Sequence, residues 1–449
     1  MQFQITNDFI ENIEQLIAKK DGNALRDLLH QYHFADIAEL LEELKSDEAT
    51  YLVKLLETDI TSEALMELDD DVREKILDRL SPKEIAKELE EMDTDDAADI
   101  IAELDVDIQQ KVINKIKDED HAADIVELLN YDENTAGGLM AKELVQVKET
   151  WTVAGCVREM RRQAENVTRV HSIYVTNKEG KLTGRLSLKD LLTASEKTKI
   201  SEVFIPKVDY VTVHTENEEV ARIMQKYDLE AIPVVDEEGI LVGRITIDDI
   251  VDFIKDEAEK DYQMAAGISQ DVEADDSIWQ LTRARLPWLV LGLFGGLGSV
   301  YIMQGFEEAL SKFPILFFFT PLIAAMAGNV GVQSSAIIVQ GLANDNVKGS
   351  LFNRLLKEVG LALINGTALG LLVIIYGYIA GLDQLVGLTI ALSMLSVIIV
   401  AALIGTFVPI ILDRRGIDPA IATGPFITTS NDIFGIFLFF YLSKIILGF

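Results

Sequence analysis

The sequence predicts a multidomain membrane protein: an all-α superhelical domain, an α/β tandem repeat and a connecting helix precede a five-helix transmembrane domain. Its 449 residues are too many for one ordinary domain. The formal net charge is −34, yet residues 286–449 hold only seven basic and eight acidic side chains. Nearly all of the negative charge therefore lies on residues 1–285. The weakly charged remainder contains five long apolar stretches, which predict membrane spans.

Composition also excludes several classes of function. An acidic surface is a poor match for a phosphate backbone, so we expect no nucleic acid partner. The single cysteine, Cys156, rules out an intrachain disulfide framework and a cysteine-cluster zinc site. The five histidines show no His-Glu-x-x-His spacing. Residues 1–16 lack the apolar segment of a cleaved signal peptide, so the acidic part is expected to stay in the cytoplasm.

Residues 1–131 are predicted to form an acidic domain of short helices stacked into a superhelix. Apolar residues recur at helical spacing through this region. Ser81-Pro-Lys-Glu84 combines an N-cap serine, a proline at the first helical position and a glutamate that can close a capping box. The sequence Ala97-Ala-Asp-Ile100 returns as Ala122-Ala-Asp-Ile125, which indicates repeated units. Such a domain usually binds something on one face and catalyses nothing.

Residues 132–200 and 201–255 are predicted to form two α/β modules. The segment 180–192 is repeated as 239–251, each a hairpin strand that ends in Ser/Thr-x-x-Asp at the start of a helix. This order resembles a tandem pair of CBS modules. In that family the aspartate often holds a ribose, which implies that Ser187 and Asp190 bind a nucleotide. Asp190 and its counterpart Asp249 fit a purely structural helix cap equally well.

Clustered carboxylates suggest sites for a hard cation such as magnesium, which prefers oxygen ligands. Asp95 and Asp99 share one helix face at spacing i, i+4, and Asp249 and Asp252 share another at i, i+3. Most other acidic runs are better explained as solvated faces. The further metal candidates are Glu218 and Asp228 in the second module, Glu257, Glu259 and Asp261 in the connector, and Asp418 in the membrane domain.

Residues 256–285 are expected to form a charged connecting helix that can transmit motion to the transmembrane domain, residues 286–449. The shortest predicted span has 18 residues, or about 27 Å of helix, and the soluble alternative would show a polar stripe that these spans mostly lack. The predicted spans are Leu286–Met303, Phe313–Leu342, Val359–Leu382, Leu385–Leu412 and Ile421–Leu442.

The distribution of basic residues predicts the orientation of these spans. With the N-terminus in the cytoplasm, only Lys312 and Lys444 lie on the outer side. The positive-inside rule therefore places the N-terminus in the cytoplasm and the C-terminus outside the plasma membrane. The inner flanks then hold Arg283, Arg285, Lys348, Arg354, Lys357, Arg414 and Arg415.

Asp432 is the only carboxylate well inside a predicted span. A charged aspartate at the bilayer centre costs ~2.5–3.5 kcal/mol on insertion scales. Facing a water-filled path it could bind a cation, whereas the alternative is a hydrogen-bonded packing role. The second predicted span adds Asn329 and Gln333 beside several small residues.

Together these features resemble the MgtE family of magnesium channels over nearly the whole chain. The most specific segments are 321–335, 428–432 with Gly435, and 131–137. Ala327 and Val332 depart from the Gly/Asn character expected in the first of them.

The resemblance implies a homodimer in the lipid bilayer with its pore on the two-fold axis and a hydrated magnesium ion at Asp432. It also implies magnesium between Asp95/Asp99 and Asp249/Asp252, and a regulatory ATP at Asp190.

The resulting hypothesis is a magnesium-selective channel gated by cytoplasmic magnesium, which binds between the N-domain, the CBS modules and the connecting helix. The alternative is a membrane receptor that reads a nucleotide through the CBS pair and transports nothing. Asp432 favours transport, because a receptor has no need of a carboxylate inside a span. Enzyme activity is not expected, because an intramembrane enzyme would need a nucleophile–base pair or two catalytic acids at that depth, and only one carboxylate is predicted there.

Overall fold

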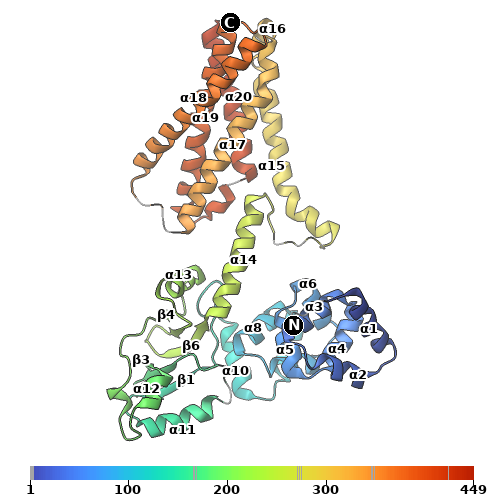
Figure 1. Cartoon of the computed structure of the whole chain (residues 1–449), viewed down its shortest axis with the longest axis vertical. Coiled ribbons are helices and arrows are strands. Elements are labelled where there is room, and N and C mark those ends of the chain that lie inside the picture. The colour runs from blue at the N-terminus through green and yellow to red at the C-terminus, as the bar shows by residue number, and fades with distance from the viewer. Residues whose placement is uncertain are drawn as a thin grey trace. The chain divides into compact units, whose positions relative to one another are not determined.

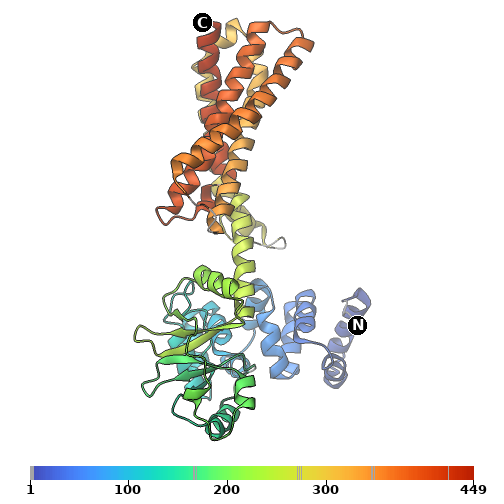
Figure 2. The same cartoon turned by 60° about the vertical axis from the view of Figure 1, so that its left-hand side comes forward.

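The computed structural model describes residues 5–164, 167, 169–270, 272, 274, 276–344, 347, 349–422 and 424–448. It divides into two compact units, Met1–Ile254 and Lys255–Phe449. Figures 1 and 2 show both, with the helical N-domain in blue, the mixed α/β region in green and the long helices from yellow to red. The predicted fold class is confirmed.

The N-domain consists of short helices packed around a continuous apolar core that includes Leu40, Leu52 and Leu65. The predicted start at Ser81 is confirmed: the Ser81 side chain accepts from the Glu84 N–H, and the Glu84 side chain accepts from the Ser81 N–H. The helices are α1 (Asn7–Ala18), α2 (Gly22–Leu29), α3 (Phe34–Glu43), α4 (Ser46–Leu55), α5 (Thr58–Met66), α6 (Asp70–Leu77), α7 (Pro82–Leu89), α8 (Thr94–Glu103), α9 (Val106–Ile113) and α10 (Glu119–Leu128).

Two three-stranded sheets form the CBS-like modules, each with one parallel and one antiparallel strand pair. The repeated turns meet each other: the Leu182 N–H donates to the Gly239 carbonyl at 3.1 Å, and the Leu241 N–H donates to the Gly180 carbonyl at 3.2 Å. These reciprocal bonds give the pair its internal symmetry. The elements are β1 (Val145–Lys148), α11 (Val153–Gln163), β2 (Ile173–Thr176), β3 (Leu182–Leu186), α12 (Leu188–Thr193), η2 (Ile200–Glu202), β4 (Val211–Thr212), α13 (Asn217–Tyr227), β5 (Ala231–Val235) and β6 (Leu241–Thr246).

The segment that leaves the N-domain lies on the edge of the second sheet. Ala141 and Arg244 exchange backbone hydrogen bonds of 2.8 and 2.9 Å. This approach requires glycine at position 243, because a Cβ there would lie 2.8 Å from the Ala141 carbonyl oxygen. The pairing holds Glu143, two residues further along, close to β6 and to the start of α8.

The connecting helix differs from the prediction. Helix α14 (Ile247–Ala265) is continuous with the last helix of the second CBS-like module and ends at Ala265, well before the expected end at 285. Gly267 adopts a φ of +80°, which terminates a helix readily because glycine has no Cβ to clash. A new helix, α15, begins after Ser277 with a capping box to Gln280.

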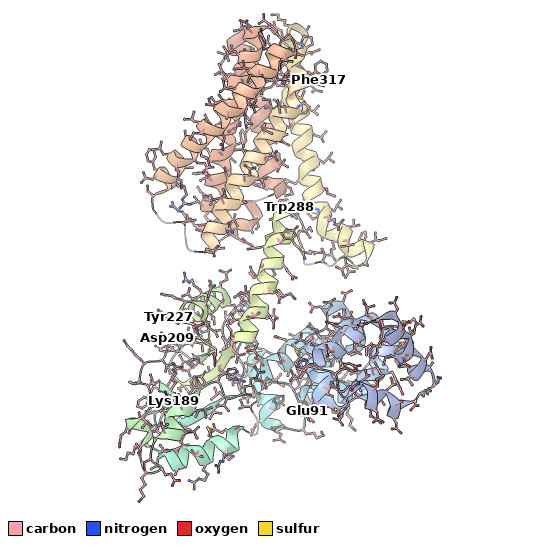
Figure 3. All side chains as sticks on the ribbon, in the orientation of Figure 1. Glu91, Lys189, Asp209, Tyr227, Trp288 and Phe317 are labelled. Atoms are coloured by element: carbon pink, nitrogen blue, oxygen red, sulfur yellow. The ribbon has the colours of Figure 1, made fainter. Side chains whose placement is uncertain are left out.

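The second unit contains five helices long and apolar enough to cross a membrane, among the residues that the structure describes. Helices α17, α19 and α20 pack against one another, while α15 lies on α20 and α18 lies on α19. Phe317 projects away from this bundle, and Trp288 lies at its opposite end (Figure 3). The elements are α15 (Ile278–Gln304), α16 (Glu307–Lys312), α17 (Ile315–Ala343), α18 (Leu351–Ile379), α19 (Gln384–Asp413), η3 (Pro419–Ala422) and α20 (Gly424–Leu447).

Candidate ion pathway and regulatory sites

A hollow of about 430 Å³ lies between α17 and α20, and Asp432 lines it. The other polar side chains on its wall are Asn329, Gln333 and Thr428. Asn329 and Gln333 are exposed in the single chain, although both lie in the interior of a long apolar helix. Exposed amides in such a helix are costly in lipid, so this face is suited to water or to a second protein surface rather than to acyl chains.

Small residues bring α17 and α20 close together at this point. A Cβ on Gly331 would lie 1.8 Å from the Asn431 Nδ2 atom, so only glycine fits there. Ala327 lies at the same crossing, where a Cβ on Gly435 would be 3.1 Å from the Ala327 Cβ. Ala327, the departure from the family pattern, is therefore a helix-packing residue in this chain. With Asn431 buried on the packed side, the neighbouring Asp432 lines the hollow.

A second carboxylate also lies inside a long apolar helix. Helix α18 begins at Leu351 rather than at Val359, so Glu358 belongs to it. The Ser334 hydroxyl donates to Glu358 Oε1 at 2.6 Å, which ties α17 to α18. The predicted span began at Val359 and left Glu358 out, because Arg354 and Lys357 in the first turns of α18 lower the local mean hydropathy.

In the first unit, carboxylates from the N-domain and from the CBS-like modules converge. Oxygen atoms of Asp93, Asp95 and Glu143 lie within 4.8 Å of one another, as in a cation site. Asp95 is buried, and the charges of Asp96 and Asp249 act on it as well. Arg244 contributes one positive charge, with its guanidinium 3.3 Å from Asp93 Oδ2.

The electrostatics of this cluster favour added positive charge. Burial, followed by the charges of Asp96 and Asp249, raises the pKa of Asp95 well above its ordinary value. Burial and the charge of Asp249 raise the pKa of Asp96 to about 8. Burial also raises the pKa of Asp249, although the Thr246 N–H and hydroxyl donate to it at 2.9 and 2.6 Å. A divalent cation would relieve this repulsion with the oxygen ligands that magnesium prefers.

The structure places the predicted carboxylates unevenly around this cluster. Asp99 still reaches solvent, although desolvation and the charges of Glu133 and Glu103 raise its pKa to about 7. Asp252 is exposed. Sequence reasoning missed Asp93, Asp96 and Glu143. The acidic run Asp93-Thr-Asp-Asp96 contained a signal for the first two, whereas Glu143 has no motif around it.

The remaining metal candidates lie apart from that cluster. Glu218 and Asp228 lie at opposite ends of α13, roughly 15 Å apart along the helix axis, so they cannot share one ion within a chain. Glu257 lies 3.6 Å from Lys260 on α14, which also carries Glu259 and Asp261. Asp418 accepts the Ala420 N–H at 2.7 Å at the start of η3.

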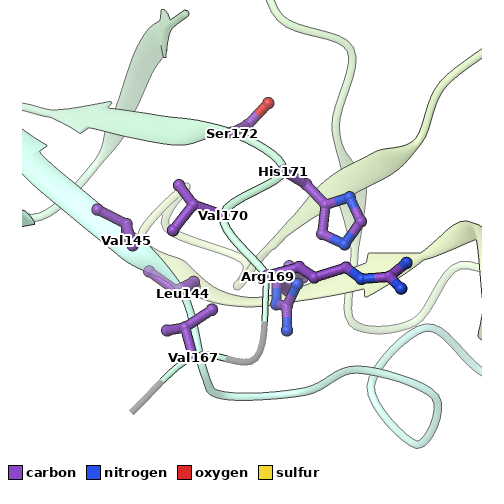
Figure 4. A pocket seen from close by; sticks show the side chains of 8 residues that line it. Leu144, Val145, Val167, Arg169, Val170, His171 and Ser172 are labelled. Atoms are coloured by element: carbon purple, nitrogen blue, oxygen red, sulfur yellow. The ribbon is translucent and has the colours of Figure 1, made fainter. Parts of the chain in front are cut away.

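The first CBS-like module holds the nucleotide candidates at the start of α12. The Ser187 hydroxyl accepts the Asp190 N–H at 3.1 Å, so the residue that caps α12 is Ser187 and not Asp190. A small hollow nearby is lined by Val145, Arg169, Val170 and His171 of the first module and by Arg244 of β6 (Figure 4). Its volume of about 10 Å³ admits a water molecule but not a nucleotide.

Comparison with family models gives matches along most of the chain. Residues 320–442 match a model described as a divalent cation transporter, and residues 32–134 match the MgtE intracellular N domain. Residues 136–197 and 200–256 match the CBS domain. One similar protein is the magnesium transporter MgtE of Thermus thermophilus, 33% identical over 453 residues that cover 97% of this chain and 98% of that protein. That of Bacillus subtilis is 36% identical over 314 residues, 70% of each chain.

Two solved structures are similar to the soluble part. The cytosolic domain of the Mg²⁺ channel MgtE in complex with ATP matches with a TM-score of 0.52 at 36% identity, over 54% of this chain and 99% of that one. The soluble part of a magnesium transporter matches with a TM-score of 0.51 at 28% identity, over 56% of this chain and 98% of that one.

Proposed function

Because the chain belongs to the MgtE family of magnesium transporters, we propose that it conducts magnesium through a pore lined by α17 and α20. The observation that carries this proposal is the hollow beside Asp432, whose wall combines one carboxylate with Asn329, Gln333 and Thr428. Magnesium gives up its hydration water reluctantly, so a site of one carboxylate and a few amides suits an ion that keeps its water shell.

We propose that the conducting form is a homodimer. In one chain the hollow is open, and its amides are exposed. A second copy related by a two-fold axis would cover these amides and bring a second Asp432 to the same path. The resulting arrangement of two carboxylates around water is what a divalent cation requires.

Magnesium also regulates the channel in this proposal. In their ionised forms, the carboxylates of Asp95, Asp96 and Asp249 repel one another when the N-domain lies against the second CBS-like module. Two like charges ~4 Å apart cost about 4 kcal/mol at an effective dielectric constant of about 20. Bound magnesium reverses the sign of this interaction, so high cytoplasmic magnesium holds the two parts together and closes the pore.

In the same proposal, magnesium also binds between the connector and the membrane domain. Its ligands there are Glu257, Glu259 or Asp261 on one side and Asp418 on the other. Because α14 continues from the second module without a break, movement of that module rotates or shifts the connector. The orientation that fits is the one with the N-terminus in the cytoplasm and the C-terminus outside, as the basic flanks predict.

ATP is proposed as a second, regulatory ligand of the first CBS-like module. Support comes from the Ser187-x-x-Asp190 sequence and from likeness to a cytosolic domain whose structure contains ATP. A flat calorimetric titration of the soluble unit with ATP would contradict this assignment. Neither ligand requires catalysis, and the chain is proposed not to be an enzyme.

The direct test is magnesium flux into liposomes that contain the purified chain, with magnesium on the soluble-domain side varied. Flux at low magnesium that stops as magnesium rises is the expected result. Nucleotide binding without any flux would instead support the receptor alternative.

A further inference from the structure

The first turns of α15, residues Ile278–Leu286, expose large apolar side chains. Trp279 is 73% exposed and Ile278 is 85% exposed, although both are large apolar side chains. Figure 1 shows this part of α15 pointing away from the other long helices, and Pro287 lies in the helix directly after it. We call residues Ile278–Leu286 the α15 entry segment.

The opposite face of the entry segment is fixed to the protein. Ala284 is fully buried, and its carbonyl accepts hydrogen bonds from the Ser269 N–H at 3.0 Å and the Ser269 hydroxyl at 2.8 Å. Helical spacing puts Trp279, Arg283 and Leu286 together on the side away from Ala284. The exposed face is therefore held in place, with an indole and a guanidinium side by side.

The positive charge of the entry segment indicates an anionic partner. Arg283 and Arg285 are exposed and have no carboxylate partner among the described residues, in a chain whose net charge is −34. The sequence just before the helix is acidic up to Asp276 and repels anions. Any attraction for an anion therefore comes from the two arginines of the entry segment. An aromatic side chain beside unpaired arginines at the end of a membrane helix matches the boundary between acyl chains and anionic headgroups.

We propose that the entry segment binds anionic phospholipid at the membrane surface, with Trp279 and Leu286 at the acyl boundary and the two arginines on headgroup phosphates. The proposal goes beyond the proposed function, because it concerns the lipid and not the transported ion. It also gives the unpaired arginines a ligand that the protein itself does not supply.

Fluorescence quenching of Trp279 tests this. In the full chain with Trp151→Phe and Trp288→Phe, Trp279 is the only tryptophan, since the sequence contains three. The protein is reconstituted in mixed phosphatidylcholine and phosphatidylglycerol vesicles, with bromine on the acyl chains of one lipid or the other at equal mole fraction. Brominated phosphatidylglycerol should quench more strongly, reflecting roughly fivefold enrichment at low salt that declines as salt is added.

Matched variants separate the possible results. Arg283→Gln with Arg285→Gln should remove the preference, and Arg283→Lys with Arg285→Lys should keep most of it. Arg414→Gln with Arg415→Gln, the exposed unpaired arginines after α19, should leave it unchanged. Three results would each overturn the proposal: equal quenching by the two lipids, a preference that survives the Gln pair, or no quenching by either lipid. The absence of quenching would indicate that protein, such as a second copy, covers Trp279.

Discussion

In the proposed pore, Asp432 is the residue on which conduction should depend most directly. It is the one carboxylate in the hollow between α17 and α20, so replacing it removes the charge that attracts a cation while α17 and α20 still pack through Gly331 and Asn431. We expect Asp432→Asn to abolish magnesium flux into liposomes with no loss of folded protein. Asp383→Asn is the control, because Asp383 caps α19 outside the hollow and asparagine can also cap. Flux at the parent rate in Asp432→Asn would contradict the pore assignment.

Glu88 is a buried carboxyl in the N-domain whose titration should be visible in stability. It is 6% exposed, accepts the Thr61 hydroxyl at 2.5 Å, and has a pKa raised to about 7 by burial, with Lys87 and Glu91 as charged neighbours. A raised folded-state pKa means that the folded form binds the proton more tightly than the unfolded form. Stability is therefore highest below about pH 4.5 and falls as pH rises to about 7, by up to about 3 kcal/mol.

Urea unfolding of residues 1–254 between pH 5 and pH 8 measures this fall. Glu88→Gln should make the decline with pH shallower and raise the free energy of unfolding at pH 8, since a neutral amide carries no burial penalty for charge. The decline that remains belongs to Asp96 and Asp99, whose pKa values are also raised. Glu91→Gln, at an exposed position nearby, should change the parent profile only slightly, because the charge of Glu91 is the smallest contribution to the raised pKa of Glu88. The assignment is wrong if the Glu88 variant keeps the full decline.

At the scale of elements, local patterns predicted most of the fold. The Ser81 capping box, the repeated glycine turns at 180 and 239, and the five long helices all follow from short-range sequence and from hydrophobic length. The break after Ala265 was missed because the charged, helix-favouring sequence around it hides the conformational role of Gly267.

The carboxylate cluster of Asp93, Asp95 and Glu143 was only partly predictable, for a different reason. Spacing along one helix selects Asp95 and Asp99, but the approach of Glu143 and Asp249 depends on contacts between distant segments. Arg244 and Asp93, for example, are 151 positions apart in the chain. No pattern within a single helix contains that information.

Two glycines allow the end of α14 to lie in close contact with the start of α20. Gly267 and Gly424 have φ values of +80° and +40°; a Cβ on the first would lie 2.4 Å from Pro425 Cγ, and on the second 2.1 Å from the Ala265 carbonyl oxygen. Alanine at either position must displace α14 from the helix that carries Asp432. We expect Gly267→Ala and Gly424→Ala to shift closure to higher magnesium and to lower thermal stability.

Gly381 provides the matched control for this pair. It has a φ of +70° with nothing within 4 Å of the added Cβ, so Gly381→Ala should cost only the backbone strain of about 1–2 kcal/mol and leave magnesium inhibition unchanged. If Gly381→Ala shifted inhibition as far as the other two variants, the contact with α20 would have no special role.

At the scale of the whole molecule, the open hollow predicts a dimer across α17 and α20. Gln333→Cys places a thiol at its exposed wall, and the only native cysteine, Cys156, is buried and gives little background. A short bismaleimide should join two chains through this position in membranes. Ile364→Cys, on the exposed face of α18, should not cross-link. Equal cross-linking at both positions would indicate random collision rather than a defined interface.

Closure by magnesium is the property that involves every domain. The carboxylates of Asp95, Asp96 and Asp249 make the compact arrangement of the first unit unfavourable without a cation, and a ligand shifts such an equilibrium only by its difference in affinity between the two states. Several ions per chain should therefore act together. Magnesium should protect residues 1–254 from protease with a steep concentration dependence.

The double variant Asp95→Asn with Asp249→Asn should lose this protection and keep the channel open at magnesium concentrations that close the parent, because the amides attract the ion only weakly while Asp93, Asp96 and Glu143 still repel one another. Asp252→Asn is the control, since Asp252 is exposed on the turn after Asp249. Flux into liposomes, measured with protease protection on the same preparation, distinguishes a lost sensor from a lost pore: a sensor defect leaves flux high at every magnesium concentration. Closure of the double variant at the parent concentration would show that magnesium acts elsewhere, most directly at the connector acids and Asp418.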